Sequence, residues 1–167
     1  MADTDKLRIG FIGTGNIARG GHLRHLSGWD DVDLVAFCDI DERAAGSAVQ
    51  EYGGTAYTST ECMLDEVALD AVYVCLPPFA HTDQEILAAQ RGVALFVEKP
   101  LCVDLAKAAE INETIKNARV VSAVGYNWRS TAITQIARER MAGRPVSAAF
   151  AYWIGGFPSV MWWRQQA

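Results

Sequence analysis

The feature that most constrains the fold is the alternation of short apolar runs with helical patterns along the first 125 residues. The runs predict strands over residues 7–12, 34–38, 55–57, 71–76, 93–97 and 120–124. They lack the polar alternation of half-exposed strands, as expected when helices cover both faces of a sheet. Strands and helices alternating at these intervals predict an α/β fold, a doubly wound parallel sheet (Rossmann fold) with right-handed crossovers.

Helical patterns fill the intervals between these runs. They extend to about residue 26 after the first strand and then cover 42–52, a brief stretch around Met63, 82–90 and 105–117. Thr58-x-x-Glu61 has the form of a capping box before the brief helix, and Asp104 is placed to cap the last one. Local signals therefore mark the starts of two of the helices.

Charge and aromatic content change near residue 125. Residues 1–120 carry 10 Lys or Arg against 19 Asp or Glu, whereas residues 121–167 carry five Arg against Glu139 alone, with four of the five Trp. A chain of 167 residues holds one domain of about 100–150 residues and a remainder too short for a second. We expect a first domain over 1–125 and the incomplete start of a second over 126–167, with a helix at 131–142 and a strand at 146–154.

Composition excludes several classes of protein. The net charge of −5 argues against a general nucleic-acid binder, and the longest apolar run, 148–154, is far shorter than a membrane helix. The N-terminus has neither the basic nor the apolar region of a secretory signal. The four cysteines are too far apart for a metal or redox pair, and no His spacing suggests a metal. We expect a cytoplasmic protein with reduced thiols and with no metal, membrane or nucleic-acid partner.

The segment Gly13-Thr14-Gly15-Asn16-Ile17-Ala18 fits G-x-G-x-x-A between the first strand and its helix. In such a turn the first glycine permits the tight bend and the second lets the backbone approach a pyrophosphate, which the helix start attracts. Glycines also serve ordinary tight turns, but the strand, the helix and a later acid follow here in the right order. The motif predicts a dinucleotide site.

The later acid is Asp39, at the end of the second strand. A carboxylate there can accept the hydroxyls of an adenosine ribose and would repel a 2′-phosphate, so the sequence favours NAD over NADP. Arg43, one helical turn later, could pair with such a phosphate. Two other interpretations stay open: Asp39 caps the next helix, or the pocket holds S-adenosylmethionine.

Three further segments follow predicted strands at their carboxyl ends, where an open α/β sheet forms its ligand crevice. They are Leu76-Pro77-Pro78-Phe79-Ala80-His81, Glu98-Lys99-Pro100 and Gly125-Tyr126-Asn127-Trp128-Arg129. With the glycine-rich turn, this set resembles the Gfo/Idh/MocA family of NAD(P)-dependent sugar and polyol oxidoreductases. The E-K-P tripeptide is the most specific element of the resemblance, which spans nearly the whole chain.

The resemblance implies hydride transfer between a nicotinamide cofactor and a sugar, polyol or related hydroxylated ring. It implies that Lys99 touches the substrate hydroxyl and the nicotinamide region, that Glu98 helps to hold a cofactor ribose, and that residues 77–81 line the cofactor cleft. Leu76 departs from the hydroxyl residue more usual before the proline. The resemblance also implies a C-terminal domain with an open sheet that binds substrate and forms homo-oligomers.

Family members carry a catalytic histidine beyond the point where this sequence stops, and residues 162–164 resemble the segment leading toward it. We therefore expect a truncated member that is inactive by itself. The alternative is an NAD(H)-binding regulatory or non-catalytic subunit that lacks this histidine.

The candidate residues fall into three sets. Lys99 is the catalytic candidate. The cofactor-binding candidates are Gly13, Gly15, Asn16, Ile17, Asp39, Arg43, Leu76, Pro77, His81, Glu98, Lys99 and Asn127. The substrate-binding candidates are Lys99, Asn127, Arg129 and Trp163.

Simpler roles remain for several of them. Lys99 could pair with Glu98 on the surface, Arg129 could be a solvated charge, and Trp163 could belong to an apolar core or interface. A cis peptide before Pro100 could aim Lys99 inward. His81 is a candidate to line the cleft, whereas His22 and His25, on the first helix, are expected to be solvated.

Overall fold

A computed structural model describes residues 6–152, 154 and 155, which divide into two compact units, the first ending at Asn127 and the second beginning at Trp128. The first unit is built on a six-stranded sheet in the order β3-β2-β1-β4-β5-β6, in which every neighbouring pair is parallel. Its strands are β1 (Leu7–Ile12), β2 (Val32–Cys38), β3 (Thr55–Tyr57), β4 (Ala71–Val74), β5 (Ala94–Val97) and β6 (Ser122–Val124). This order confirms the predicted doubly wound parallel sheet.

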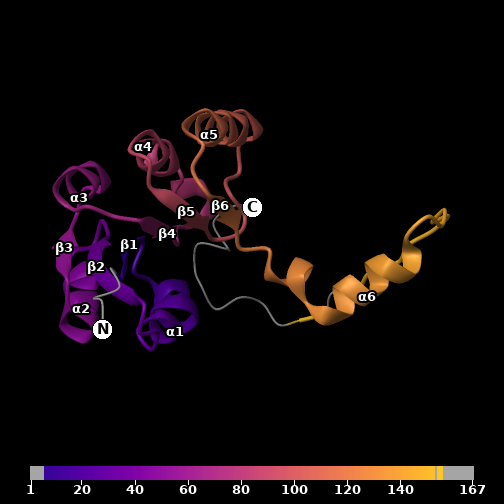
Figure 1. Cartoon of the computed structure of the whole chain (residues 1–167), viewed down its shortest axis with the longest axis horizontal. Coiled ribbons are helices and arrows are strands. Elements are labelled where there is room, and N and C mark those ends of the chain that lie inside the picture. The colour runs from indigo at the N-terminus through magenta and orange to yellow at the C-terminus, as the bar shows by residue number, and fades with distance from the viewer. Residues whose placement is uncertain (1–5, 153, 156–167) are drawn as a thin grey trace. The chain divides into compact units, whose positions relative to one another are not determined.

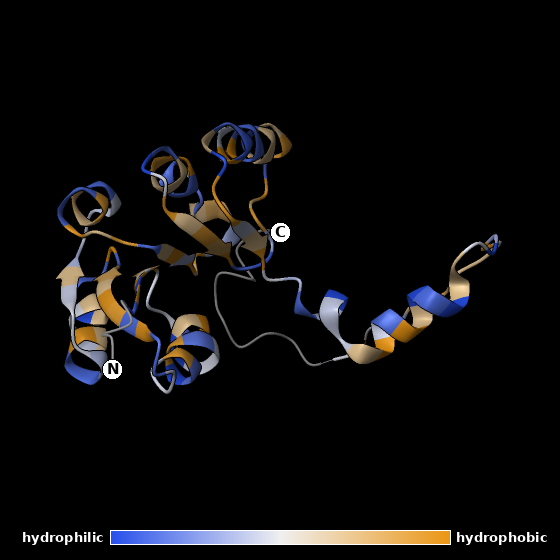
Figure 2. Cartoon of the chain, in the orientation of Figure 1, coloured by the Kyte–Doolittle hydropathy of each residue, from blue (hydrophilic) through white to orange (hydrophobic). Residues whose placement is uncertain are grey.

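Helices cover both faces of the sheet (Figure 1). One layer holds η1 (Ala18–Leu23), α1 (Arg24–Leu26) and α2 (Glu42–Tyr52), and the other holds α3 (Thr60–Glu66), α4 (Gln84–Gln90) and α5 (Leu105–Ala118). Phe11 and Ile12, neighbours on β1, enter different buried clusters because successive strand residues point to opposite faces. Figure 2 shows the hydrophobic residues concentrated along the strands. A separate hydrophobic core therefore lies on each face of the sheet.

Several predicted elements match the structure residue for residue, among them β1, α2 and β3. The predicted start of α4 at Thr82 is wrong by two residues. The Thr82 amide and hydroxyl both donate to Oε1 of Gln84, at 2.7 and 3.3 Å, so a local turn occupies this stretch and the helix begins at Gln84.

The cap of α3 also differs from the prediction. Ser59, not Thr58, is the N-cap, and its hydroxyl accepts a hydrogen bond from the Cys62 amide at 3.3 Å. Thr58 and Ser59 are both good capping residues, and the motif alone did not separate them. The other predicted cap is confirmed, because the Asp104 carboxylate accepts from the amides of Ala106 and Lys107.

The first helix contains an irregular segment. Within a helical run over residues 16–26, Ala18–Leu23 is π-helical. Gly20 and Gly21 lie in this segment and are weak helix formers, which leaves the backbone free to accept the wider turn. Ala18 and Leu23 are buried against the sheet all the same, so the helix keeps its apolar contact.

The second unit contains a helix, α6 (Ala132–Met141), preceded by the 3-10 turn η3 (Asn127–Ser130). The predicted strand over 146–154 is wrong: none of its described residues, 146–152 and 154, belongs to a strand. A strand needs a partner for its backbone hydrogen bonds, and the described part of this unit supplies only a helix and a turn.

Candidate functional site

The carboxyl ends of five strands form one row. The Gly13 amide donates to Cys38 O, Cys75 N to Ile12 O, and Glu98 N to Val74 O, at 2.7–2.8 Å. The Gly125 amide continues the row by donating to Val97 O at 2.8 Å. These bonds place the glycine-rich turn, Asp39, Leu76, Glu98 and Gly125 along the edge where a doubly wound sheet binds ligands.

Gly13 is required by the shape of the turn. Its φ is +85°, and a Cβ added there would lie 2.6 Å from the carbonyl oxygen of Cys75. Any other residue would therefore combine backbone strain with a clash against β4. The tight bend predicted from the motif is present.

The shape of the turn does not require a glycine at position 15. A Cβ at this position would meet nothing within 4 Å, so no protein contact requires a glycine. The space above it is open, and Asn16 and Ile17, which begin the helix, are exposed. Amides at a helix start beside open space suit the pyrophosphate of a dinucleotide.

Thr14 and Arg19 hold this turn in place, and sequence reasoning missed both. Thr14 is buried, and its amide and hydroxyl donate to Oδ2 of Asp39 at 2.9 and 3.1 Å. Arg19 donates through Nε to Thr14 O at 3.1 Å and through a terminal nitrogen to Ala44 O. Thr14 is the variable residue of G-x-G, so the motif itself gave no signal of its role.

Asp39 faces the glycine-rich turn. Oδ2 accepts from Thr14. Among the residues that the structure describes, Oδ1 accepts only from the Asp41 amide, at 3.0 Å, and keeps a lone pair for a ribose hydroxyl. The interpretation of Asp39 as a helix cap is wrong, because Asp41 is the N-cap of α2. Arg43 is 94% exposed and lies 3.7 Å from Asp41.

The segment after β4, residues 76–81, is held by contacts of a buried histidine. His81 is buried, its Nδ1 lies 2.6 Å from Oε1 of Glu85, and Nε2 lies 3.4 Å from Leu76 O. Its ring therefore fixes the loop. The expectation that His81 lines an open cleft is wrong, because the side chain is buried. Leu76 packs on the core beside Gly13, and Pro77 is half-buried.

Glu98 and Lys99 differ in exposure. Glu98 is 15% exposed and bonds through Oε1 to His22 Nε2 at 2.8 Å, whereas Lys99 is exposed. In the described part of the chain Lys99 forms no ion pair with Glu98, so the surface-pair interpretation is wrong; instead its amide donates to Oε2 of Glu98 at 3.1 Å. The Lys99–Pro100 peptide is cis, as the sequence suggested. The expectation that His22 is solvated is also wrong.

The substrate-binding candidates are less completely placed. Asn127 is exposed after β6, at the end of the row, and Arg129 is exposed within the second unit. The Arg129 carbonyl accepts from Gln135 Nε2 at 2.7 Å. Trp163 lies outside the described residues.

Cys75 lies beneath the row. Burial raises the pKa of its thiol to about 12, with a smaller contribution from the negative charge of Glu98. Such a thiol stays protonated at neutral pH and is a poor nucleophile. Cys75 is therefore not a candidate nucleophile at this edge.

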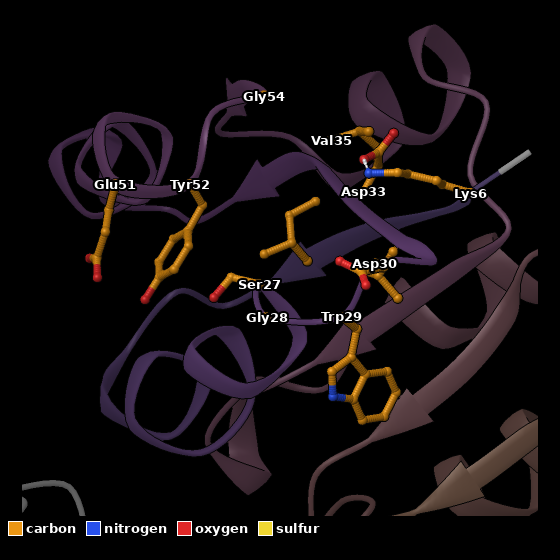
Figure 3. A pocket seen from close by; sticks show the side chains of 12 residues that line it. Lys6, Ser27, Gly28, Trp29, Asp30, Asp33, Val35, Glu51, Tyr52 and Gly54 are labelled. Carbon is orange, nitrogen blue, oxygen red and sulfur yellow. Dashed lines mark ion pairs between the residues drawn. The ribbon is translucent and has the colours of Figure 1, made fainter. Parts of the chain in front are cut away.

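A hollow elsewhere on the first unit is lined largely by polar groups (Figure 3). Lys6, Trp29 and Gly54 line it just before β1, β2 and β3, and residues 32–35 line it from the first half of β2. The hollow therefore lies toward the amino ends of the strands, away from the candidate site. Among the residues that the structure describes, no group of three or more His, Cys, Asp or Glu could hold a metal. No helix in the described ranges has the length and hydropathy of a membrane span.

Comparison with known proteins agrees with this arrangement. The model of the Gfo/Idh/MocA oxidoreductase family, described by its NAD-binding Rossmann fold, matches residues 7–126. Glucose-6-phosphate 3-dehydrogenase of Bacillus subtilis is 30% identical over 73% of this chain and 34% of its own length. Myo-inositol 2-dehydrogenase of Thermotoga maritima is 32% identical over 74% of this chain and 37% of its own.

Solved structures show the same fold. The WlbA dehydrogenase of Bordetella pertussis, in complex with NADH and UDP-GlcNAcA, superimposes with a TM-score of 0.74 at 26% identity. The superposition covers 81% of this chain and 42% of that one. The chain thus spans between a third and a half of the length of these relatives. On this evidence the chain belongs to the Gfo/Idh/MocA oxidoreductase family and contains its NAD-binding Rossmann fold.

Proposed function

We propose that the protein is an NAD-dependent oxidoreductase that moves a hydride between the nicotinamide and a hydroxyl-bearing carbon of a sugar or polyol. The observation that carries the proposal is the single row joining the open turn at Gly15, the Asp39 carboxylate and the Glu98–Lys99 pair. The relatives are named as dehydrogenases, which favours an enzyme over a non-catalytic subunit.

The residues of the turn fit a dinucleotide. In the proposal the amides of residues 15–17 hold the pyrophosphate, and Oδ1 of Asp39 accepts a hydroxyl of the adenosine ribose. A negative carboxylate at that point repels a 2′-phosphate, so NAD is the preferred form. Arg43 is 94% exposed and its Nε lies 3.7 Å from Asp41, so water screens its charge and it does not cancel that of Asp39.

Lys99 and Glu98 supply the chemistry beside the ring. A nicotinamide held at this edge would supply the hydride acceptor or donor. Lys99 Nζ has no carboxylate partner in the described part of the chain. It can therefore donate a hydrogen bond to the substrate oxygen and accept the proton of the substrate hydroxyl. Glu98 holds the other ribose, with Leu76, Pro77 and the loop fixed by His81 beside it. Asn127, Arg129 and Trp163 are proposed to bind substrate hydroxyls.

Calorimetric titration with NADH tests the proposal on the 167-residue chain. Asp39→Ala should weaken NADH binding at least tenfold, since it removes the ribose acceptor and frees the Thr14 amide. Asp39→Asn, which keeps the shape, should still lose affinity and should discriminate less against NADPH. Asp41→Ala removes the cap of α2 but keeps the amide that donates to Asp39, so it should bind NADH as the wild type does. Equal affinity in all four proteins would contradict the proposal.

Location and assembly belong to the same proposal. We propose a cytoplasmic protein that forms homo-oligomers through its C-terminal part. Support comes from the four free cysteines and from exposed apolar residues of the second unit, such as Ile133, Phe150 and Ile154. Light scattering of the protein as it is made in its source cells would report its assembly.

A further inference from the structure

His22 and Glu98 are 76 residues apart and meet at the edge of the sheet. His22 comes from the first helix and Glu98 from the residue after β5, and their Nε2 and Oε1 atoms lie 2.8 Å apart. The side chains are only 18% and 15% exposed. A contact so short and so shielded from water is stronger than a surface ion pair.

The imidazole of His22 is held by aromatic neighbours. Its ring centroid lies 5.3 Å from that of Tyr73 and 5.2 Å from that of Phe96, and those two rings stack on each other at 4.7 Å. These contacts restrict rotation of the imidazole, so Nε2 is aimed at Glu98 before any ligand binds. The histidine is a fixed donor or acceptor, not a flexible surface group.

The carboxylate of Glu98 has two further close neighbours. A Cβ added at Gly125 would lie 3.3 Å from Oε1 of Glu98, which shows how closely the β6 end approaches it. Oε2 accepts the Lys99 amide at 3.1 Å. The two oxygens of Glu98 thus connect a side chain of the first helix to the backbone of Lys99.

We infer that His22 is a positioning residue that holds the Glu98 carboxylate and, through it, sets the backbone of Lys99. The first helix also begins at the glycine-rich turn, so one element carries both the phosphate-binding amides and the group that fixes the lysine. The relevance of this link to cofactor binding rests on the proposed function. The geometric part, from His22 to the Lys99 amide, does not.

The test uses ¹⁵N-labelled 167-residue chain and four variants. His22→Phe keeps an aromatic ring against Tyr73 and Phe96 but removes Nε2. His22→Gln places an amide nitrogen near the position of Nε2, and His22→Asn is too short to reach Glu98. His25→Phe is the matched control, because His25 is exposed on the same helix. Urea unfolding of each variant checks that it folds.

The Lys99 amide resonance is the first readout. It should move in His22→Phe and His22→Asn, stay at its wild-type position in His25→Phe, and return toward it in His22→Gln. NADH affinity, the second readout, should fall roughly three- to tenfold in the first two variants and recover in His22→Gln. If His22→Phe does not fold, His22→Asn takes its place.

Two results would overturn the inference: an unmoved Lys99 amide in both disruptive variants, or a His22→Gln protein that behaves like His22→Phe in both readouts. The second would assign the effect to ring packing and not to the hydrogen bond. If no protein binds NADH and yet the Lys99 amide moves as expected, the proposed function fails and the role of His22 stands.

Discussion

At the scale of single residues, two glycines in one motif serve different needs. Gly13 has a positive φ and no room for a methyl group, so the fold itself requires it. A Cβ added at Gly15 would meet no atom within 4 Å, and its φ is not positive, so only a ligand would require a glycine there. The two positions therefore separate folding from binding.

Alanine substitution should reveal this difference. Gly13→Ala should lower the free energy of unfolding by about 2–4 kcal/mol, through backbone strain and the contact with Cys75 O. Gly15→Ala should change it by less than about 1 kcal/mol but should abolish NADH binding, because the methyl fills the pyrophosphate approach. Urea unfolding and NADH titration measure the two effects. A Gly15→Ala protein with wild-type NADH affinity would contradict the proposed pyrophosphate site at the glycine-rich turn.

The sequence predicts residue roles only where a motif defines them. The glycine-rich turn, Asp39 and the E-K-P tripeptide were found at the edge of the sheet as expected. Their partners were not foreseen: Thr14 for Asp39, His22 for Glu98 and Glu85 for His81. These pairs depend on which polar tips meet once the sheet is assembled, and neither propensity nor periodicity carries that information.

At the scale of elements, apolar periodicity placed the strands and helices, and competing local hydrogen bonds decided their ends. β1, α2 and β3 have clear signals on both sides, such as Gly53 after α2. The start of α4 was misplaced because Gln84 bonds back to Thr82. The run at 146–154 has the composition of a strand, but composition cannot supply the partner that a strand needs.

The cap of α3 gives a direct test at this scale. Ser59→Ala should lower the free energy of unfolding by about 1 kcal/mol, because the Cys62 amide loses its acceptor. Thr58→Ala, one residue earlier and exposed, should leave stability unchanged within about 0.5 kcal/mol. Parallel urea unfolding curves decide the matter. A larger loss from Thr58 than from Ser59 would restore the capping box predicted from the sequence.

At the scale of the whole molecule, the sheet order brings the candidate groups to one edge, together with the half-buried thiol of Cys75. The pKa of Cys75 is raised from 9.0 to about 12, while Cys62 is exposed. The unfolded chain would ionise Cys75 near its ordinary pKa, so this group makes stability fall as the pH rises above about 9.

Thiol labelling at pH 8 should reflect this arrangement. Cys62 should react rapidly with a disulfide reagent, the half-buried Cys75 much more slowly because its pKa is raised, and the buried Cys38 only after urea unfolds the chain. Cys62→Ser should remove the rapid phase. Labelling of Cys75 at the rate of Cys62 would show that the sheet edge is open where the structure is closed.

The central claim is that this edge of the sheet holds NAD(H), and a crystal structure of the chain grown with NADH tests it most directly. We predict that the pyrophosphate will lie within hydrogen-bond distance of the amides of residues 15–17, with the adenosine ribose on Asp39 and the nicotinamide beside Lys99. Electron density for NADH in the hollow near Trp29, or at any site that leaves the glycine-rich turn without a ligand, would contradict it.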